Sequence, residues 1–469
     1  MYNFIKYPLI AMKKVLQTQF LKYIRILSKL QLAKIKPVIV GVSGSEGKTS
    51  TTDAIKLVLD TKYTVKKTGK ANSETGVPLD ILGIEVKSYS VKNWIKLALL
   101  SIWKLATNWE KYDIYVVEMG IDSPFEPKNM GYLLKVISPD IGVLTSISSV
   151  HAENYAPLVK EQNLSDEKKI EMLRDEIAKE KGRLIKSAIK KGGNGIVNID
   201  NSYIEDFIIK EELDVYGVSN SELENPKLLR ILEAENTTEG FCATYQNKGN
   251  KYKLNVTDAL LGEEYAYTFG FAIQTGLLLG IDIKTAVEAL ETYKAPEGRF
   301  RLLKGIKNSK IIDSTYNSSP VTLEQALYLF SKYDSKGRKI LVLGDMRELG
   351  DIEKTEHERI ARIAAKLNFH KFYLVGKNMT THFADELRNK GISESKIHSF
   401  ENSLKLGKTL KNDIQEMDFV LAKGSQNTIF LEEAIKQILE AESKPDEPSS
   451  LLCRQSKWWL ERKMKFFNI

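Results

Sequence analysis

A glycine-rich segment followed by lysine and threonine is the part of this sequence with the clearest chemical meaning. Residues 41–52 read Gly-Val-Ser-Gly-Ser-Glu-Gly-Lys-Thr-Ser-Thr-Thr, after the β-branched run Val38–Val40 and before an amphipathic stretch over 53–60. A strand, a glycine loop and a helix in this order are typical of a phosphate-binding loop, whose backbone N–H groups turn toward a polyphosphate at the positive end of the helix. The segment therefore predicts nucleotide binding.

The residues of this loop have distinct expected roles. Lys48 would neutralise the outer phosphates, and the hydroxyl of Thr49 would coordinate Mg²⁺. The spacing departs from the commonest form of the loop, because the first glycine is Gly41 and Val42 occupies its expected place. The residues expected to surround the nucleotide are Gly44, Ser45, Glu46, Gly47, Lys48, Thr49 and Ser50.

Two further predicted strands lead to residues that could complete such a site. The run Ile114–Val117 ends at Glu118, and the run Ile141–Leu144 leads to His151. In a parallel sheet, ligands bind at the carboxyl ends of the strands. We therefore expect Glu118, His151 and the glycine loop to converge on one edge of a sheet.

Length and composition limit the class of protein. A chain of 469 residues is expected to form two or three domains, and 42% hydrophobic with 28% charged residues is typical of a soluble globular protein. The two cysteines, Cys242 and Cys453, lie far apart in the sequence. They predict neither a disulfide framework nor a paired-cysteine zinc site, which fits a reducing cytoplasm.

Positive charge is concentrated at the two ends of the chain. Residues 1–36 contain eight Lys and Arg and no Asp or Glu, and residues 451–469 contain five basic residues against Glu461. Because the net charge of the whole chain is only +8, the part between the ends is mildly acidic. This distribution argues against a nucleic-acid-binding core, so no nucleic acid partner is expected.

The basic N-terminal segment permits two interpretations. Lysines interrupt its apolar residues, so it predicts neither a membrane span of about 20 apolar residues nor a secretory signal. Five of its apolar residues have helical spacing, namely Phe20, Tyr23, Ile24, Leu27 and Leu30. Such a helix could lie on an anionic lipid surface, or it could pack on the first domain with its lysines in solvent.

The second half of the chain predicts another α/β unit. Apolar runs that end in polar or glycine-bearing turns predict strands at 310–312, 340–343, 372–375 and 419–421, with helices from about 322, 357, 380 and 429. We therefore expect an α/β protein with a central P-loop ATPase domain, built on a parallel sheet, and a C-terminal Rossmann-like domain. The expected divisions are a basic helix over 1–36, the two domains over 37–298 and 299–440, and a linker with a basic aromatic tail over 441–469.

Several motifs, in this order, resemble those of the Mur ligase family of ATP-dependent enzymes, which extend the peptidoglycan stem peptide. The loop over 44–49 resembles the family's ATP loop, and Asn72–Pro78 resembles its asparagine-rich turn ending in Gly-x-Pro. Glu118 resembles the Mg²⁺-binding glutamate and His151 the metal-site histidine. Lys181 resembles the lysine that becomes carbamylated.

Motifs in the second half resemble those of the branch of this family that adds D-alanyl-D-alanine. Asp313–Pro320 matches Asp-x-x-Tyr-Asn-x-x-Pro, and residues 344–350 match Gly-Asp-Met-x-Glu-Leu-Gly. Lys423-Gly-Ser matches the final motif, and Arg299 resembles the hinge arginine that reaches the nucleotide. The resemblance spans about residues 37–440.

The resemblance implies an ADP-forming carboxylate–amine ligase that uses ATP and Mg²⁺ and makes a peptide bond through an acyl phosphate. Its substrates would be a muramoyl peptide, or a related carboxylate, and a D-amino-acid dipeptide. The implied residues are Lys48, His151, Lys181 and Arg299 for catalysis, Asp313 and Asn317 with the loop for the nucleotide, and Thr49, Glu118, His151 and Lys181 for metal ions. Lys181 could also be a surface charge of a helix.

Two departures from the family pattern concern substrate recognition. The family normally carries a uridine-nucleotide-binding domain ahead of the ATP loop, and we expect it to be absent because 40 residues precede Gly41. The family's His-Asn-x-x-Asn segment appears here as Glu-Tyr-Ala-Tyr-Thr over 264–268. No adenine contacts are assigned to that segment.

Three functions remain open at this stage. The first is ligation on a peptidoglycan precursor, and the second is the same ligation on a folate or a lipid-linked wall precursor. The third is a nucleotide-gated binding protein without turnover. The branch motifs favour the first, and the intact Lys48, Thr49, Glu118 and His151 argue against the third.

We expect a monomer in the cytoplasm, with peripheral contact to the inner face of the membrane. Residues 1–36 are basic, and the tail over 451–469 joins basic residues to Trp458, Trp459, Phe466 and Phe467. Basic residues are attracted to anionic lipid and aromatic residues favour the headgroup level. The alternative is that the tail folds back and buries its tryptophans.

Overall fold

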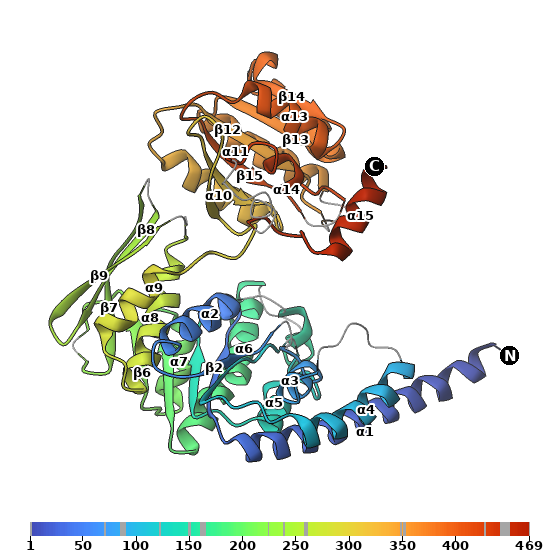
Figure 1. Cartoon of the computed structure of the whole chain (residues 1–469), viewed down its shortest axis with the longest axis vertical. Coiled ribbons are helices and arrows are strands. Elements are labelled where there is room, and N and C mark those ends of the chain that lie inside the picture. Colours follow the sequence, from blue (N-terminus) through green and yellow to red (C-terminus); the bar gives the residue numbers. More distant parts are fainter. Residues whose placement is uncertain are drawn as a thin grey trace. The chain divides into compact units, whose positions relative to one another are not determined.

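In the computed structural model, the chain forms two compact units (Figure 1). The first unit comprises residues 1–234, 243–254 and 263–293, and the second comprises residues 235–242, 255–262 and 294–469. The structure describes residues 2–69, 72–84, 91–121, 123–148, 152–159, 166–223, 225–237, 240–257, 261–347, 349, 353–425, 428–440 and 451–468.

The first unit is built on a nine-stranded sheet with the order β2-β3-β1-β4-β5-β6-β7-β8-β9. Its strands are β1 (Val38–Ser43), β2 (Val65–Lys67), β3 (Ile114–Glu118), β4 (Ile141–Leu144), β5 (Asn194–Asn198), β6 (Tyr216–Ser219), β7 (Leu228–Thr237), β8 (Gly240–Asn247) and β9 (Asn250–Thr257). The division into units assigns residues 235–237, 240–242 and 255–257 of the last three strands to the second unit. Its helices are α1 (Tyr2–Ile35), α2 (Lys48–Leu59), α3 (Gly76–Ile81), α4 (Val91–Thr107), α5 (Met130–Val136), η1 (Ala152–Leu158), α6 (Asp166–Lys190), α7 (Ser202–Lys210), α8 (Glu264–Leu278) and α9 (Ile283–Glu291).

The central strands of this sheet bring the predicted site residues to one edge. β3 and β4 are buried along their whole length, as expected for parallel strands covered on both faces. Both pair in parallel with β1, where Val42 lies beside Glu118 and Ser43 lies beside Leu144. The three strands therefore end side by side, and the segments that follow them share the carboxyl edge of the sheet.

Helix α1 packs on the first unit. Phe20, Leu21, Ile24 and Leu27 belong to a buried cluster that also includes residues of α3, α4 and α5. Leu30, which shares their helical spacing in the sequence, is 51% exposed. Of the two interpretations of this segment, packing on the first domain therefore holds for the other four of the five apolar residues named from the sequence. Within the described residues, no helix is long and apolar enough to cross a membrane.

The second unit contains a six-stranded sheet with the order β10-β11-β15-β12-β13-β14, in which only the β10–β11 pair is antiparallel. Its strands are β10 (Arg301–Lys304), β11 (Lys310–Ser314), β12 (Lys339–Gly344), β13 (Lys371–Val375), β14 (Ile397–Phe400) and β15 (Phe419–Lys423). Its helices are α10 (Pro320–Lys332), α11 (Glu353–Lys366), η3 (Met379–Phe383), α12 (Ala384–Asn389), η4 (Glu394–Lys396), α13 (Ser403–Asp413), α14 (Glu432–Ile435) and α15 (Lys457–Phe467). The last predicted helix starts at Glu432 rather than near Ile429.

The C-terminal tail lies against the second unit. The ring of Phe430 contacts those of Trp459, Phe466 and Phe467 of α15. Trp458 is nevertheless 58% exposed and Trp459 is partly buried. The tail therefore folds back, as the alternative interpretation expected, but it does not bury both tryptophans.

Candidate active site

The loop between β1 and α2 has a backbone that requires glycine at two positions. Gly47, directly before α2, has φ 77°, in the left-handed region that residues with a side chain rarely adopt. Gly44 has φ 150°, and a Cβ atom added there would lie 2.0 Å from Oγ1 of Thr145. Gly47 is therefore required by conformation, and Gly44 by the close approach of the segment after β4.

That segment after β4 also holds the loop in place. The N–H of Ser45 donates to the carbonyl of Ser146 at 2.8 Å, and the N–H of Glu46 donates to Oγ of Ser146 at 3.1 Å. Oγ1 of Thr145 donates to the carbonyl of Glu46 at 2.6 Å. The segment after β4 thus fixes the backbone of the loop, which is the kind of support that a binding site needs.

Lys48 opens α2, and its ammonium group folds back over the loop. Nζ donates to the carbonyl oxygens of Gly44 at 2.9 Å and Ser45 at 3.0 Å. The N-terminus of α2 adds partial positive charge at the same point. The loop, the helix terminus and the cation therefore fit the phosphates of a nucleotide such as ATP.

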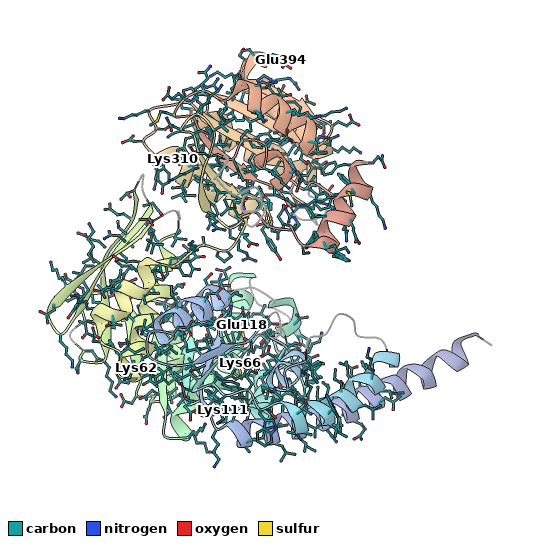
Figure 2. All side chains as sticks on the ribbon, viewed as in Figure 1. Lys62, Lys66, Lys111, Glu118, Lys310 and Glu394 are labelled. Atoms are coloured by element: carbon teal, nitrogen blue, oxygen red, sulfur yellow. The ribbon has the colours of Figure 1, made fainter. Side chains whose placement is uncertain are left out.

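Thr49 and Glu118 face each other at the start of α2 and the end of β3. Oγ1 of Thr49 donates to Oε2 of Glu118 at 2.8 Å, and Nδ2 of Asn72 donates to Oε1 at 3.1 Å. Glu118, labelled in Figure 2, is 8% exposed. Hydroxyl and carboxylate oxygens are ligands that Mg²⁺ prefers, so this pair fits the metal ion expected from the sequence.

Lys181 of α6 is buried beside the same loop. Its side chain is 2% exposed, and Nζ donates to the carbonyl of Gly44 at 3.2 Å and to that of Ile121 at 3.5 Å. Lys179, on the same helix, is instead exposed and pairs with Glu176. Lys181 therefore does not have the position of a surface charge, and its carbamylation stays a prediction.

His151 lies outside the described residues, so its expected role as a metal ligand also stays a prediction. Among the residues that the structure describes, no group of three or more His, Cys, Asp and Glu could hold a metal ion. The described metal-ligand candidates near the loop are thus Thr49 and Glu118, joined at 2.8 Å.

In the second unit, predicted residues gather at the turn after β11. The guanidinium of Arg299 lies over the ring of Tyr316, 4.8 Å from its centroid. The backbone carbonyl of Asn317 accepts a hydrogen bond from Nζ of Lys423 at 3.0 Å. Asp313, near the end of β11, is fully buried beside this turn.

The carboxylate of Asp313 has one satisfied oxygen. Oδ1 accepts from the N–H of Thr315 at 3.1 Å and from its Oγ1 at 2.6 Å, whereas Oδ2 has no hydrogen-bond partner in the described structure. Burial raises the pKa of Asp313 to about 6, although the bonds from Thr315 oppose the shift. Because buried polar atoms are normally paired, Oδ2 is a candidate acceptor for a donor group of a ligand.

Lys423, at the end of β15, is 3% exposed and also donates to Oγ of Ser314 at 3.2 Å. Burial, with a contribution from the charge of Arg299, lowers the pKa of Lys423 to about 8. An anion bound near these two cations would relieve their repulsion. This part of the second unit therefore favours an anionic group.

Three residues of these sites have no role assigned from the sequence. Asn72 and Lys423 belong to motifs recognised in the sequence, so a role for them could have been predicted from those motifs. The hydroxyl of Tyr265 lies 3.1 Å from Oγ of Ser50 in the loop. Tyr265 belongs to the segment that departs from the family pattern, and nothing in the sequence pointed to its contact.

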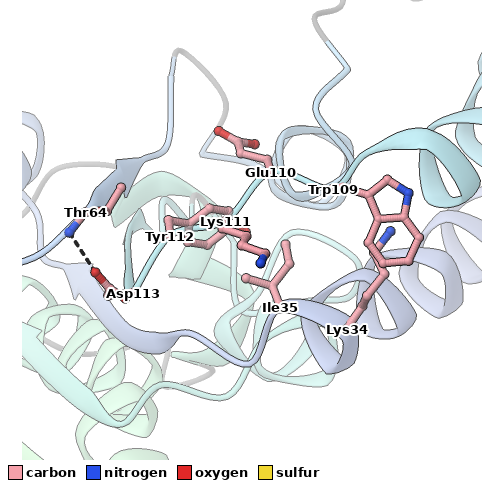
Figure 3. A pocket seen from close by; sticks show the side chains of 8 residues that line it. All are labelled: Lys34, Ile35, Thr64, Trp109, Glu110, Lys111, Tyr112 and Asp113. Atoms are coloured by element: carbon pink, nitrogen blue, oxygen red, sulfur yellow. Dashed lines mark hydrogen bonds between the residues drawn. The ribbon is translucent and has the colours of Figure 1, made fainter.

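A cavity of about 330 Å³ lies at the opposite edge of the first sheet (Figure 3). Its lining includes Lys34 and Ile35 at the end of α1 and residues 109–113 ahead of β3. Asp113 accepts a hydrogen bond from the N–H of Thr64 there, at 2.9 Å. None of the residues predicted to act in the reaction lines this cavity, so it is separate from the candidate active site.

The strand, the glycine loop and the paired Thr49 and Glu118 define a P-loop nucleotide-binding protein whose second unit is another α/β domain. The Mur ligase middle domain matches residues 42–169, and the Mur ligase glutamate ligase domain matches residues 298–426. The chain therefore belongs to the Mur ligase family. These matches confirm the predicted family.

Individual proteins agree with this placement. The UDP-N-acetylmuramoyl-tripeptide–D-alanyl-D-alanine ligase of Bacillus subtilis (strain 168) is 26% identical over 416 residues, which cover 88% of this chain and 79% of that protein. MurF from Acinetobacter baumannii has a similar fold, with a TM-score of 0.66 and 19% identity over 89% of this chain and 79% of that chain. MurF ligase from Thermotoga maritima, solved in complex with ADP, has a TM-score of 0.62 and 21% identity, over 88% of this chain and 83% of that chain. The predicted α/β fold class is confirmed.

Proposed function

We propose that the protein is an ATP-dependent, ADP-forming ligase that adds D-alanyl-D-alanine to a muramoyl-peptide precursor of peptidoglycan. The observation that carries this proposal is the contact of Thr49 with Glu118 next to Lys48, because it places candidate metal ligands beside a candidate phosphate-binding loop. The name of the Bacillus subtilis relative supports the substrate class.

The reaction brings several anionic groups together. A carboxylate of the first substrate would attack the γ-phosphoryl group of ATP and release ADP. The amine of the second substrate would then lose a proton and displace phosphate from the acyl phosphate, which forms the amide bond. Thr49 and Glu118 would hold Mg²⁺, which would neutralise charge on the phosphates when bound. Lys48 offsets the negative charge that grows during phosphoryl transfer.

The remaining predicted residues have supporting roles in this proposal. A carbamylated Lys181 would carry oxygen ligands for a second metal ion, together with His151. The burial of Lys181 beside Gly44 supports this role. Asp313 and Asn317 would contact the nucleotide, and Arg299 would stabilise charge on its γ-phosphate.

A substrate panel tests the proposal. Release of ADP from ATP and Mg²⁺ is measured with UDP-muramoyl peptides, lipid-linked muramoyl peptides and folates, each with and without the matching amine. We expect stimulation by a muramoyl tripeptide with D-alanyl-D-alanine. Stimulation only by a folate with glutamate, or only by a lipid-linked precursor, would replace the acceptor, and ATP binding without turnover would support a nucleotide-gated binding protein.

The proposal includes a monomer in the cytoplasm that contacts the inner face of the membrane through residues 1–36 and 451–469. Eight basic residues in the first segment and five in the second support the membrane contact. Light scattering measures the molar mass of the protein in solution and so tests whether it is a monomer. Flotation with anionic vesicles tests the membrane contact by comparing the wild-type chain with a variant in which the exposed Lys22, Lys29, Arg462 and Lys465 are replaced by Glu. Equal binding of the two proteins contradicts the contact.

A further inference from the structure

Helices α1 and α4 of the first unit run side by side (Figure 1). The hydroxyl of Tyr23 donates to the carbonyl of Ala98 at 2.8 Å. Further along, Nζ of Lys34 donates to the carbonyl of Leu105 at 2.9 Å. The two helices are therefore fixed to each other along a seam, and the reaction proposed above uses neither of them.

Helix α4 exposes a row of large apolar side chains. Ile95, Leu99, Ile102 and Trp103 have exposed fractions of 70%, 67%, 54% and 65%. With 3.6 residues per turn, these four positions fall on one side of the helix. That side adjoins the one that carries Ala98, which contacts α1. The row therefore borders the seam.

Helix α1 contributes to the same surface. Ile26 and Leu30, one turn apart, are 57% and 51% exposed. By helical spacing they lie next to the side of α1 that carries Tyr23 and Lys34, which both bond to α4. The exposed apolar side chains of the two helices thus flank one seam. We name the six residues the seam strip: Ile26, Leu30, Ile95, Leu99, Ile102 and Trp103.

The charged residues of the two helices that form the seam strip all have the same sign. The sequence of α1 contains seven Lys and Arg, that of α4 contains three, and neither contains Asp or Glu. Lys22 and Lys29 are exposed beside Ile26 on the side away from the seam, and Lys96 is exposed beside the row on α4. An apolar strip bordered by lysines is complementary to the headgroups and acyl chains of an anionic bilayer.

We propose that the seam strip is an interfacial binding surface for an anionic lipid bilayer. The apolar side chains would enter the boundary between headgroups and acyl chains, and the lysines would meet lipid phosphates. A second copy of the chain could also cover the strip, but it would bring the basic borders of two copies together, and like charges oppose that contact. The inference is independent of which substrate the enzyme ligates.

The test is flotation of the full chain with vesicles of phosphatidylcholine, alone or mixed with an equal amount of phosphatidylglycerol, at low and high salt. The variant is Leu99→Glu combined with Trp103→Glu. We expect the wild-type chain to bind the mixed vesicles at low salt and the variant to bind at least about tenfold more weakly. Neither residue touches the active site, so ATP turnover measures the proposed function separately.

A control variant makes the result specific. Ile209→Glu changes a residue of α7 that is 67% exposed, as Leu99 is. It is expected to bind as the wild-type chain does, and thermal unfolding checks that every variant is folded. Absence of wild-type binding at low salt, or equal loss in Ile209→Glu, overturns the proposal. So does a wild-type dimer that the double substitution dissociates, since the strip would then belong to a second copy.

Discussion

Glu432 and Arg454 form an ion pair that is almost completely withdrawn from solvent. Nε of Arg454 donates to Oε1 of Glu432 at 2.8 Å, and Nη2 donates to Oε2 at 2.5 Å. The two side chains expose 0% and 3% of their surface, respectively. Two parallel bonds of this kind fix the guanidinium geometrically as well as electrostatically. The pair therefore joins the segment ahead of α15 to the start of α14.

The same guanidinium reaches the turn that follows β11. Nη1 donates to the carbonyl of Tyr316 at 2.9 Å, and Nη2 donates to that of Thr315 at 2.7 Å. Thr315 in turn bonds the carboxylate of Asp313. The C-terminal segment therefore supports the backbone of the candidate site in the second unit.

Replacement of Arg454 by methionine should destabilise the protein. It leaves the buried Glu432 with Lys463 as its remaining cation, at 2.9 Å, and removing one partner of a buried pair costs about 3–5 kcal/mol. Urea unfolding measures the loss. Arg462→Met is the control, because Arg462 is exposed on α15. Equal midpoints for the two variants would show that the buried pair does not hold the tail.

Lys48→Ala should abolish turnover without unfolding the chain. The lost cation contacts Gly44 and Ser45 in the phosphate loop, so the rate of ADP release should fall at least about a hundredfold. Lys56→Ala, at a partly exposed position of the same helix where the lysine pairs with Asp60, should retain activity. Unchanged ADP release by folded Lys48→Ala would show that the loop is not part of the active site.

The residues at the carboxyl edge of the first sheet could be predicted from the sequence, because each strand can be recognised from a short run of its own residues. Each of β1, β3 and β4 is a short apolar run, and parallel strands end at the same edge, so Glu118 had to approach the loop. The structure brings it to 2.8 Å from Thr49. The residue types and their order were sufficient to predict that the two segments meet at this edge, whereas the pairing of Glu118 with Thr49 was implied by the family resemblance.

Contacts between distant segments could not be predicted in the same way. Helical spacing shows which side of α1 is apolar, but it does not show that Ile24 is buried in the first unit while Leu30, on the same side, is 51% exposed. Arg454 appears in the sequence as one more basic residue of the tail, and only the fold brings it to Glu432. The short strands β5 and β10 escaped prediction as well, because short runs with polar residues carry a weak pattern.

Lys181→Ala should be inactive, and short exogenous carboxylates should partly restore it. If Lys181 is carbamylated, the carboxylate replaces the missing oxygen ligand beside Gly44. Lys179→Ala on the same helix is the matched control, because Lys179 is exposed and paired with Glu176. ADP release with and without acetate measures rescue. Full activity of Lys181→Ala without acetate would exclude a role for the lysine.

Asp313→Asn should change how stability depends on pH. The pKa of Asp313 is about 6 in the folded protein against an ordinary 3.8, so folding favours the protonated carboxyl. The contribution of Asp313 to the free energy of unfolding is fully present below pH 3.8. It is lost as pH rises to about 6, a decline of about 3 kcal/mol. The asparagine variant cannot ionise and should lack this decline. Unfolding free energies measured across this range would contradict the assignment if the two proteins kept a constant difference.

Lys423 should give the enzyme a loss of activity at alkaline pH. Its pKa of about 8, against an ordinary 10.5, means that the free enzyme loses this cation as pH rises through about 8. If the charged form binds an anionic group of the substrates, kcat/KM for ATP should fall over the same range. The arginine of Lys423→Arg stays charged in this range, so the fall in kcat/KM should move to higher pH. Lys423→Met should have a low kcat/KM at every pH, without an inflection near pH 8. A pH profile that Lys423→Arg leaves unchanged would assign the ionisation to another group.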